Sequence, residues 1–120
     1  MLVNLRGNSA QAEQRAHATL ASFLAARKER AQAEAQLRKV SENSYMDHHV
    51  AYALGAAYTQ LGDHTKAREW LARAADTGLP CYPWYARDPL LEPLRADREF
   101  QSFMTGLQKR WESAKARYAP

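Results

Sequence analysis

Residues 51–80 contain a ladder of small and large apolar residues, and this ladder restricts the possible fold more than any other part of the sequence. Leu54 and Gly55 lie on one face of a helix, where the glycine allows a second helix to approach closely. Gly62 suits the left-handed position after a helix, and Asp63 suits the N-cap of the next one. The ladder therefore predicts two helices packed as a tight hairpin. Its members are Ala51, Leu54, Gly55, Tyr58, Leu61, Gly62, Asp63, Ala67, Leu71, Ala74 and Pro80.

The same ladder resembles the tetratricopeptide repeat, a helix–turn–helix unit of about 34 residues with the pattern W-x2-L-G-x2-Y, then A-x3-F, then P. Ala51 stands where the family usually has tryptophan, and Leu71 stands where it usually has an aromatic residue. The clear repeat covers residues 48–81. The resemblance implies a scaffold that binds other polypeptides, so we expect protein interaction rather than catalysis.

A weaker copy of the pattern precedes the clear repeat by one repeat length. It predicts a degenerate repeat over residues 14–47, built from helices at 10–28 and 31–42. The junction Arg27–Arg30 has no glycine, proline or asparagine, so one uninterrupted helix over 10–42 is the alternative; we favour the break. The matched pairs are Leu20 with Leu54, Leu24 with Tyr58, Ala33 with Ala67, and Leu37 with Leu71.

The first of these helices carries a single apolar stripe. Asn8 or Ser9 is its expected N-cap, because both side chains can accept a hydrogen bond from the first turn. We expect the stripe to pack against the following helices. It consists of Ala16, Leu20, Phe23 and Leu24.

The composition favours helices throughout. The chain has 120 residues and a mass of 13.6 kDa, which fits one domain over 1–120. Isoleucine is absent and valine is found only at positions 3, 40 and 50, so an all-α fold is indicated. No apolar run approaches the ~20 residues of a membrane span, and we expect no membrane insertion. The single cysteine, Cys81, cannot form an internal disulfide; it leaves the compartment open, with a lean toward the cytoplasm.

Polar residues predict where the later helices begin and end. Asp47 is a suitable cap for a helix over 48–61, and Asp63 for one over 64–77 that ends before Gly78. A polar connection is expected at 41–44, before the first of these two helices. After the second, prolines at 80 and 83 predict an extended segment over 79–85.

The last part of the chain is expected to hold one short and one long helix. Asp88 is an N-cap followed by proline at the first helical position, and Pro93 limits the short helix at 90–95 to one or two turns. Asp97 caps a final amphipathic helix over 98–118. Its apolar stripe consists of Phe100, Phe103, Met104, Leu107, Trp111, Ala114 and Tyr118.

Residues 84–100 carry a second resemblance. They are similar to the aromatic-x-x-D-P-x-L-x-P-L-R-x-D-P-x-F ending that closes repeat arrays in many large bacterial proteins, with Arg98 in place of the last proline. The resemblance implies that residues 82–120 form a structural cap, and that the domain is the C-terminal part of a larger bacterial signalling or regulatory protein. The residues expected to build this cap are Trp84, Asp88, Pro89, Leu94 and Phe100.

The repeat family binds extended peptides or helices on the concave face formed by the first helix of each unit, so a protein or peptide is the expected partner. Tyr52 is the most informative candidate, because the repeat register turns it away from the packing stripe. The alternative is that the preceding helix or the last helix folds across this strip. The candidate binding residues are His49, Tyr52, Thr59 and Gln60, with Ala53 and Ala56 between them, and Arg15, Thr19, Ser22 and Ala26 in the weaker repeat.

The sequence offers little for other kinds of chemistry. His48 and His49 point about 100° apart on a helix, and Cys81 has no base at a recognised offset, so neither a metal site nor a nucleophile is expected. No catalytic or phosphate-binding motif is present, and we expect no cofactor and no enzymatic activity. The net charge of +4 is spread over the chain, apart from a local excess at 109–117. Regulatory nucleic-acid association through this basic tail is the alternative function.

Overall fold

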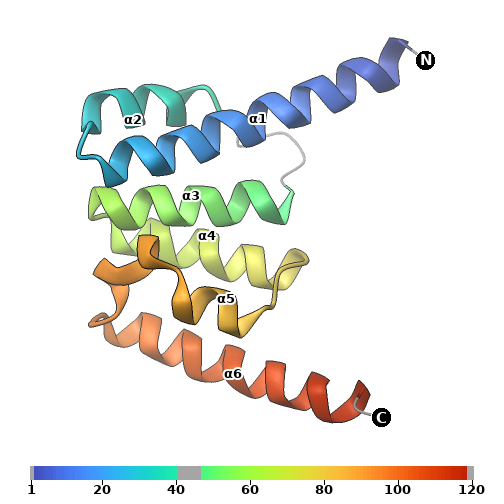
Figure 1. Ribbon diagram of the computed structural model, residues 1–120, viewed down its shortest axis with the longest axis vertical. Helices are drawn as coiled ribbons and strands as arrows, with labels where there is room; N and C mark the ends of the chain where they lie inside the picture. Colours follow the sequence, from blue (N-terminus) through green and yellow to red (C-terminus); the bar gives the residue numbers. More distant parts are fainter. Residues whose placement is uncertain (1, 41–46, 119–120) are drawn as a thin grey trace.

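The computed structural model describes residues 2–40 and 47–118, and all regular secondary structure in these two ranges is helical. The prediction of an all-α fold is therefore confirmed. The helices stack in order along the longest axis of the molecule, from α1 and α2 at one end to α6 at the other (Figure 1). They are α1 (Leu2–Ala26), α2 (Arg30–Arg38), α3 (His48–Leu61), α4 (His64–Thr77), α5 (Tyr82–Arg87), the 3₁₀ helix η1 (Pro89–Leu94) and α6 (Arg98–Tyr118).

The predicted break between the first two helices is present. α1 ends at Ala26 and α2 begins at Arg30, with Lys28 in the left-handed region at φ 66°. A lysine therefore takes the conformation that glycine usually supplies at such a turn. The caps predicted at Asn8 or Ser9 are wrong, because α1 already starts at Leu2 and includes both positions. The polar connection predicted at 41–44 lies outside the described residues.

The α3–α4 hairpin forms at the predicted residues. The Asp47 carboxylate accepts a hydrogen bond from the His49 backbone N–H at 2.6 Å, and the Asp63 carboxylate accepts one from the Lys66 N–H at 3.1 Å. Gly62 ends α3 in the left-handed conformation, at φ 87°. Gly55 is equally required, because a Cβ at this position would lie 2.6 Å from the Leu71 Cγ.

The prediction of an extended segment over 79–85 is wrong, since α5 begins at Tyr82. Pro83 lies in the first turn of α5, where the missing N–H would have had no helical partner. The Cys81 carbonyl accepts from the Trp84 N–H at 3.0 Å and starts the helix. Prolines at 80 and 83 thus set where the helix begins and do not prevent it.

The predictions for the last two elements are confirmed. The Asp88 carboxylate accepts from the Leu90 N–H at 2.9 Å, Pro89 is the first residue of η1, and the element is two turns of 3₁₀ helix. The Asp97 carboxylate accepts from the Phe100 N–H, also at 2.9 Å, at the start of α6. Both caps follow from the preference of aspartate for the residue just before a helix.

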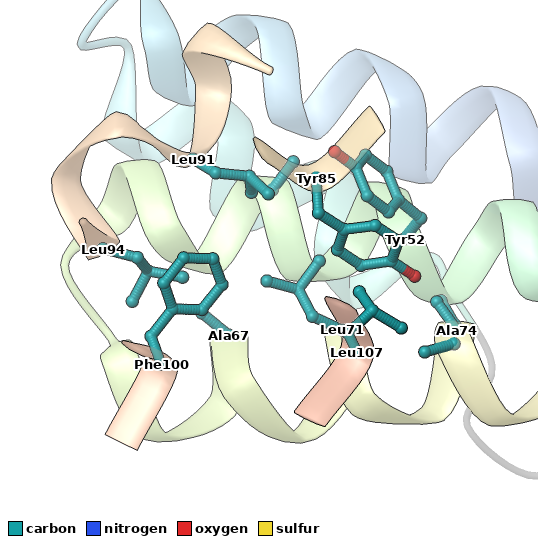
Figure 2. Close-up of a cluster of buried hydrophobic side chains, with 12 residues drawn as sticks. Tyr52, Ala67, Leu71, Ala74, Tyr85, Leu91, Leu94, Phe100 and Leu107 are labelled. Carbon is teal, nitrogen blue, oxygen red and sulfur yellow. The ribbon is translucent and has the colours of Figure 1, made fainter. Parts of the chain in front are cut away.

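The main hydrophobic core lies between α3, α4 and the cap elements that follow them. Figure 2 shows side chains of α3, α4, α5, η1 and α6 meeting around Leu71 of α4. A smaller cluster of Ala18, Val40, Val50 and Leu54 joins α1 and α3, and Leu37 of α2 packs against it. The largest buried side chains of the main core are Tyr52, Leu71, Tyr85, Leu91, Leu94, Phe100 and Leu107.

The predicted stripes of α1 and α6 are only partly buried. Leu20 is 44% exposed and Phe23 is 55% exposed, because α1 turns a different face, rich in alanine, toward α2 and α3. Ala16 is exposed as well. On α6 the stripe is buried at Phe100 and Leu107 but reaches solvent at its far end, where Tyr118 is 79% exposed.

Candidate partner-binding surface

Tyr52 is part of the core and not of an exposed strip, so the prediction that it projects into a groove is wrong. Its side chain is only 8% exposed. The hydroxyl donates a hydrogen bond to the Asp88 carboxylate at 2.5 Å, and the ring packs edge-on against Tyr85, with centroids 5.0 Å apart. Burial, followed by the bond to Asp88, raises the pKa of Tyr52 well above its ordinary value.

The rest of the predicted strip on α3 is also largely covered. Thr59 is buried and its hydroxyl donates to the Gly55 carbonyl at 2.7 Å. Gln60 donates from its side-chain amide to the Leu90 carbonyl at 2.7 Å, which ties α3 to η1. The elements that cover the strip are α5 and η1, whereas the alternative expected from the sequence is the preceding helix or the last helix. Of the predicted α3 residues, only His49 is well exposed.

The predicted α1 residues are divided between core and surface. Ser22 is 3% exposed and donates to the Thr19 carbonyl at 2.7 Å, so it is unable to meet a partner. Arg15 is half exposed and lies 3.5 Å from the Asp47 carboxylate. Thr19 and Ala26 are exposed. The structure thus brings Arg15 close to the start of α3 but leaves no continuous polar strip with His49 and Gln60.

Asp88 and Arg95 hold in place the covering segment, which consists of α5 and η1. Asp88 accepts both the Tyr52 hydroxyl and the Leu90 N–H, on its two carboxylate oxygens. Arg95 donates to the carbonyls of Tyr85 and Asp88, each at 3.0 Å, and so fastens η1 to the end of α5. Leu94 and Phe100 are buried, as predicted for residues of a cap.

Trp84 is the predicted cap residue that the structure places differently. It is 58% exposed, because α5 is a helix and adjacent residues on a helix point about 100° apart; Tyr85 takes the core direction and is fully buried. Trp84 lines an open, mostly apolar cavity of about 590 Å³. Recognising α5 as a helix would have revealed this. The lining residues are Cys81, Pro83, Trp84, Arg87, Asp88, Pro89 and Leu90.

Arg87 gives the rim of this cavity its charge. It is exposed, and the part of the chain that the structure describes provides no carboxylate within ion-pair distance of it. The carboxyl group of the lining, that of Asp88, is already engaged by Tyr52 and by the Leu90 N–H. The cavity therefore combines an apolar floor with one available positive charge.

Asp47, His48 and His49 form a polar cluster at the start of α3. The Nδ1 of His49 lies 2.8 Å from the Asp47 carboxylate, and the Nδ1 of His48 lies 3.8 Å from it. The two imidazole rings are therefore closer to each other than the angle of about 100° between adjacent helical residues suggests. Arg15 lies on the other carboxylate oxygen. Partial burial raises the pKa of Asp47, but the bonds from His49 and both histidine charges outweigh it, and the pKa is lowered overall. These contacts suit a carboxylate that caps α3 and has its negative charge balanced by its neighbours.

The basic end of α6 lies at the far end of the molecule from α1 (Figure 1). Lys109, Lys115 and Arg117 are exposed, and Arg110 pairs with Asp76 at 3.1 Å. Among the described residues, no helix is both long and apolar enough to cross a membrane.

Comparison with known proteins gives no match. No protein-family model, no curated protein and no solved structure matches this chain.

Proposed function

We propose that this protein is a peptide-binding module of the tetratricopeptide type. Three features of the packing support the repeat assignment. α1 and α3 run side by side, and each is followed by a returning helix (Figure 1). Gly55 lets α4 approach α3, and Ala67 and Ala74 of α4 are fully buried, as the repeat pattern requires. In the weaker repeat Ala33 is fully buried at the position that matches Ala67.

The third unit supports the same assignment. In Figure 1, α5 and η1 lie on the side of α3 away from α1, and α6 runs back beyond them. Gln60 and Tyr52 of α3 bond to this broken helix. The resemblance of residues 84–100 to the end of bacterial repeat arrays further supports the proposal that the module belongs to a larger signalling or regulatory protein.

The observation that carries the binding proposal is the exposed Trp84 on its apolar cavity. A tryptophan left more than half exposed beside two prolines and a leucine is typical of an anchor for a partner residue. The occupant we propose is an extended peptide with one large apolar side chain in the cavity and an acidic residue beside it. The acidic residue would pair with Arg87, whose charge is available.

Selection of peptides from a random display library on the immobilised protein tests this function. We expect the enriched peptides to combine an aromatic or branched apolar residue with a neighbouring Asp or Glu. Their affinity should fall at least ~10-fold with Trp84→Ala, which is the loss expected for a central interface residue. Tyr118→Ala is the matched control, because Tyr118 is an exposed aromatic residue away from the cavity.

Two results would count against the proposal. Either no peptide is enriched above background, or the enriched peptides bind Trp84→Ala as well as they bind the unchanged protein. Peptides that respond to Trp84→Ala but not to Arg87→Gln would remove the acidic residue from the proposed partner and leave the apolar anchor.

A further inference from the structure

α1 and α3 use equivalent faces, displaced along the chain by one repeat of about 34 residues. Each helix turns one face toward the elements that follow it in the chain. On α1 this face consists of Ala18, Ala21, Ser22 and Ala25, and on α3 of the matching Tyr52, Gly55, Ala56 and Thr59. All of these residues are buried. The two helices therefore occupy equivalent places in a repeating arrangement.

α3 also buries a second face, which it turns toward the elements that precede it. Val50 and Leu54 belong to the same buried cluster as Ala18 of α1 and Val40 beyond α2. Ala57 lies on the same side of the helix by its spacing and is fully buried. α3 thus docks on the α1–α2 hairpin through small and branched apolar residues.

The equivalent face of α1 is apolar but open. One repeat earlier than Val50, Leu54 and Ala57 the chain has Ala16, Leu20 and Phe23, and we name these three residues the outer face of α1. Leu20 is 44% exposed where Leu54 is 3% exposed, and Phe23 is 55% exposed where Ala57 is fully buried. Of the four faces in this repeating arrangement, only the outer face of α1 is left open by the residues that the structure describes.

We propose that the outer face of α1 docks a helical hairpin whose packing surface resembles that of α1–α2. The template is the interface between the α1–α2 hairpin and α3. There the hairpin covers the equivalent face of α3, which lies one repeat later in the chain. Phe23 is larger than Ala57, so the docked hairpin needs a recess opposite this side chain. This inference is independent of the Trp84 cavity, which lies on α5.

A second copy of this chain is a poorer occupant. Its α1–α2 packing surface is already covered by its own α3. The other end of the stack is α6, whose second half is largely exposed and carries charged side chains, including Lys109, Lys115 and Arg117. Such a surface does not complement an apolar face.

Duplication of residues 14–47 within the full chain tests the proposal. The extended chain would contain residues 1–47 followed by 14–120, so that the second outer face meets the packing surface of an added hairpin. Two versions are needed, one with Phe23 kept in the downstream copy and one with Phe23→Ala to match Ala57. We expect at least one to melt more than ~5 °C above the parent chain, because each repeat interface contributes to stability.

The matched control places Leu20→Lys and Phe23→Lys in the downstream copy. These changes should abolish the gain in melting temperature, whereas the same pair in the parent chain, where both residues are exposed, should shift it by less than ~2 °C. The proposal is overturned if neither duplicated chain gains stability, or if the lysine pair leaves the gain intact. Light scattering gives a further check, since a parent dimer that Phe23→Lys dissociates would assign the face to a second copy.

Discussion

Tyr52 connects three elements with one side chain. Its ring packs against Tyr85 of α5, and its hydroxyl reaches Asp88, whose other carboxylate oxygen caps η1. The carboxylate is partly shielded from water, so the tyrosine hydroxyl replaces a hydrogen bond that solvent would otherwise supply. A residue chosen from the sequence as a binding hot spot is therefore part of what holds the covering segment onto α3.

The Tyr52 hydroxyl should make stability depend on alkaline pH. Burial and the bond to Asp88 raise the pKa of Tyr52 in the folded protein, so the folded state keeps its proton where the unfolded state loses it. The stability from this group is complete below about pH 10, the ordinary tyrosine pKa, and falls as the pH rises above it. We expect Tyr52→Phe to be less stable than the parent at pH 8 but to lose less of its free energy of unfolding between pH 9 and 11.

Denaturant unfolding at several pH values measures this difference. Tyr118→Phe is the control, because Tyr118 is exposed, and its pH profile should match that of the parent. Parallel profiles for Tyr52→Phe and the parent chain would contradict the role given to the hydroxyl.

Phe100 and Trp84 should differ sharply when each is truncated to alanine. Phe100 is 1% exposed in the main core, so Phe100→Ala should cost about 3–5 kcal/mol of unfolding free energy. Trp84 is more than half exposed, and Trp84→Ala should cost less than ~1 kcal/mol. Urea titrations of the two variants measure both values. Equal large losses would mean that Trp84 is buried after all and is unsuited to anchor a peptide.

Among the helical elements, α3 has the most demanding environment, because it packs on both sides. It contacts α1 and α2 through one face and α4, α5 and η1 through the other. Gly55 lies at a close approach of α3 to α4, against Leu71. The distance between the two helices of this hairpin is therefore set by a missing side chain.

Gly55→Ala is expected to destabilise the protein despite the better helix propensity of alanine. The new Cβ would lie 2.6 Å from the Leu71 Cγ and 3.3 Å from the Leu71 backbone nitrogen, so the Leu71 side chain or the two helices have to shift. Overpacking of this kind costs about 1–3 kcal/mol, more than the gain of up to ~1 kcal/mol from replacing a helical glycine. Gly106→Ala is the control, because a Cβ there has open space around it. Thermal melts showing Gly55→Ala as stable as the control would refute the close approach.

The elements differ in how far the sequence could predict them. The starts of α3, α4 and α6 follow from Asp47, Asp63 and Asp97, because a cap acts through residues only two or three positions away. Whether Tyr52 is buried depends on where residues 82–94 pack, and no local sequence pattern specifies this. Prolines at 80 and 83 predict an extended segment from local preferences alone, whereas the structure forms the helical α5 that exposes Trp84.

At the scale of the whole molecule, the packing is uneven along the stack. The main core, from α3 to α6, buries large side chains such as Tyr85, Phe100 and Leu107. The α1–α2 end buries chiefly alanines together with Val40, and α1 leaves Leu20 and Phe23 exposed. Since buried apolar area is the main source of stability, the α1–α2 end gains less per residue from folding.

This unevenness predicts a gradient of local stability that amide hydrogen exchange can measure. A stack of helices in which each unit contacts mainly its neighbours can open from one end, with a free energy below that of global unfolding. We expect amides in α2 and in α1 at 11–26 to exchange through such an opening, faster than amides in α3 and α4. The α4 amides around Leu71, which lie in the main core, should report the global free energy.

Two variants distinguish a true end-opening from fraying of single helices. Leu54→Ala truncates the largest buried side chain of the cluster that joins α3 to the α1–α2 end, and it should accelerate exchange throughout α1 and α2 together while affecting α4 less. Phe100→Ala should instead accelerate the slowest amides of α4, because it weakens the main core. Uniform protection from α1 to α6, changed equally by both variants, would show one cooperative unit and contradict the gradient. In the duplicated chain the original α1–α2 hairpin would lie inside the stack, and its amides should then approach the protection of α3.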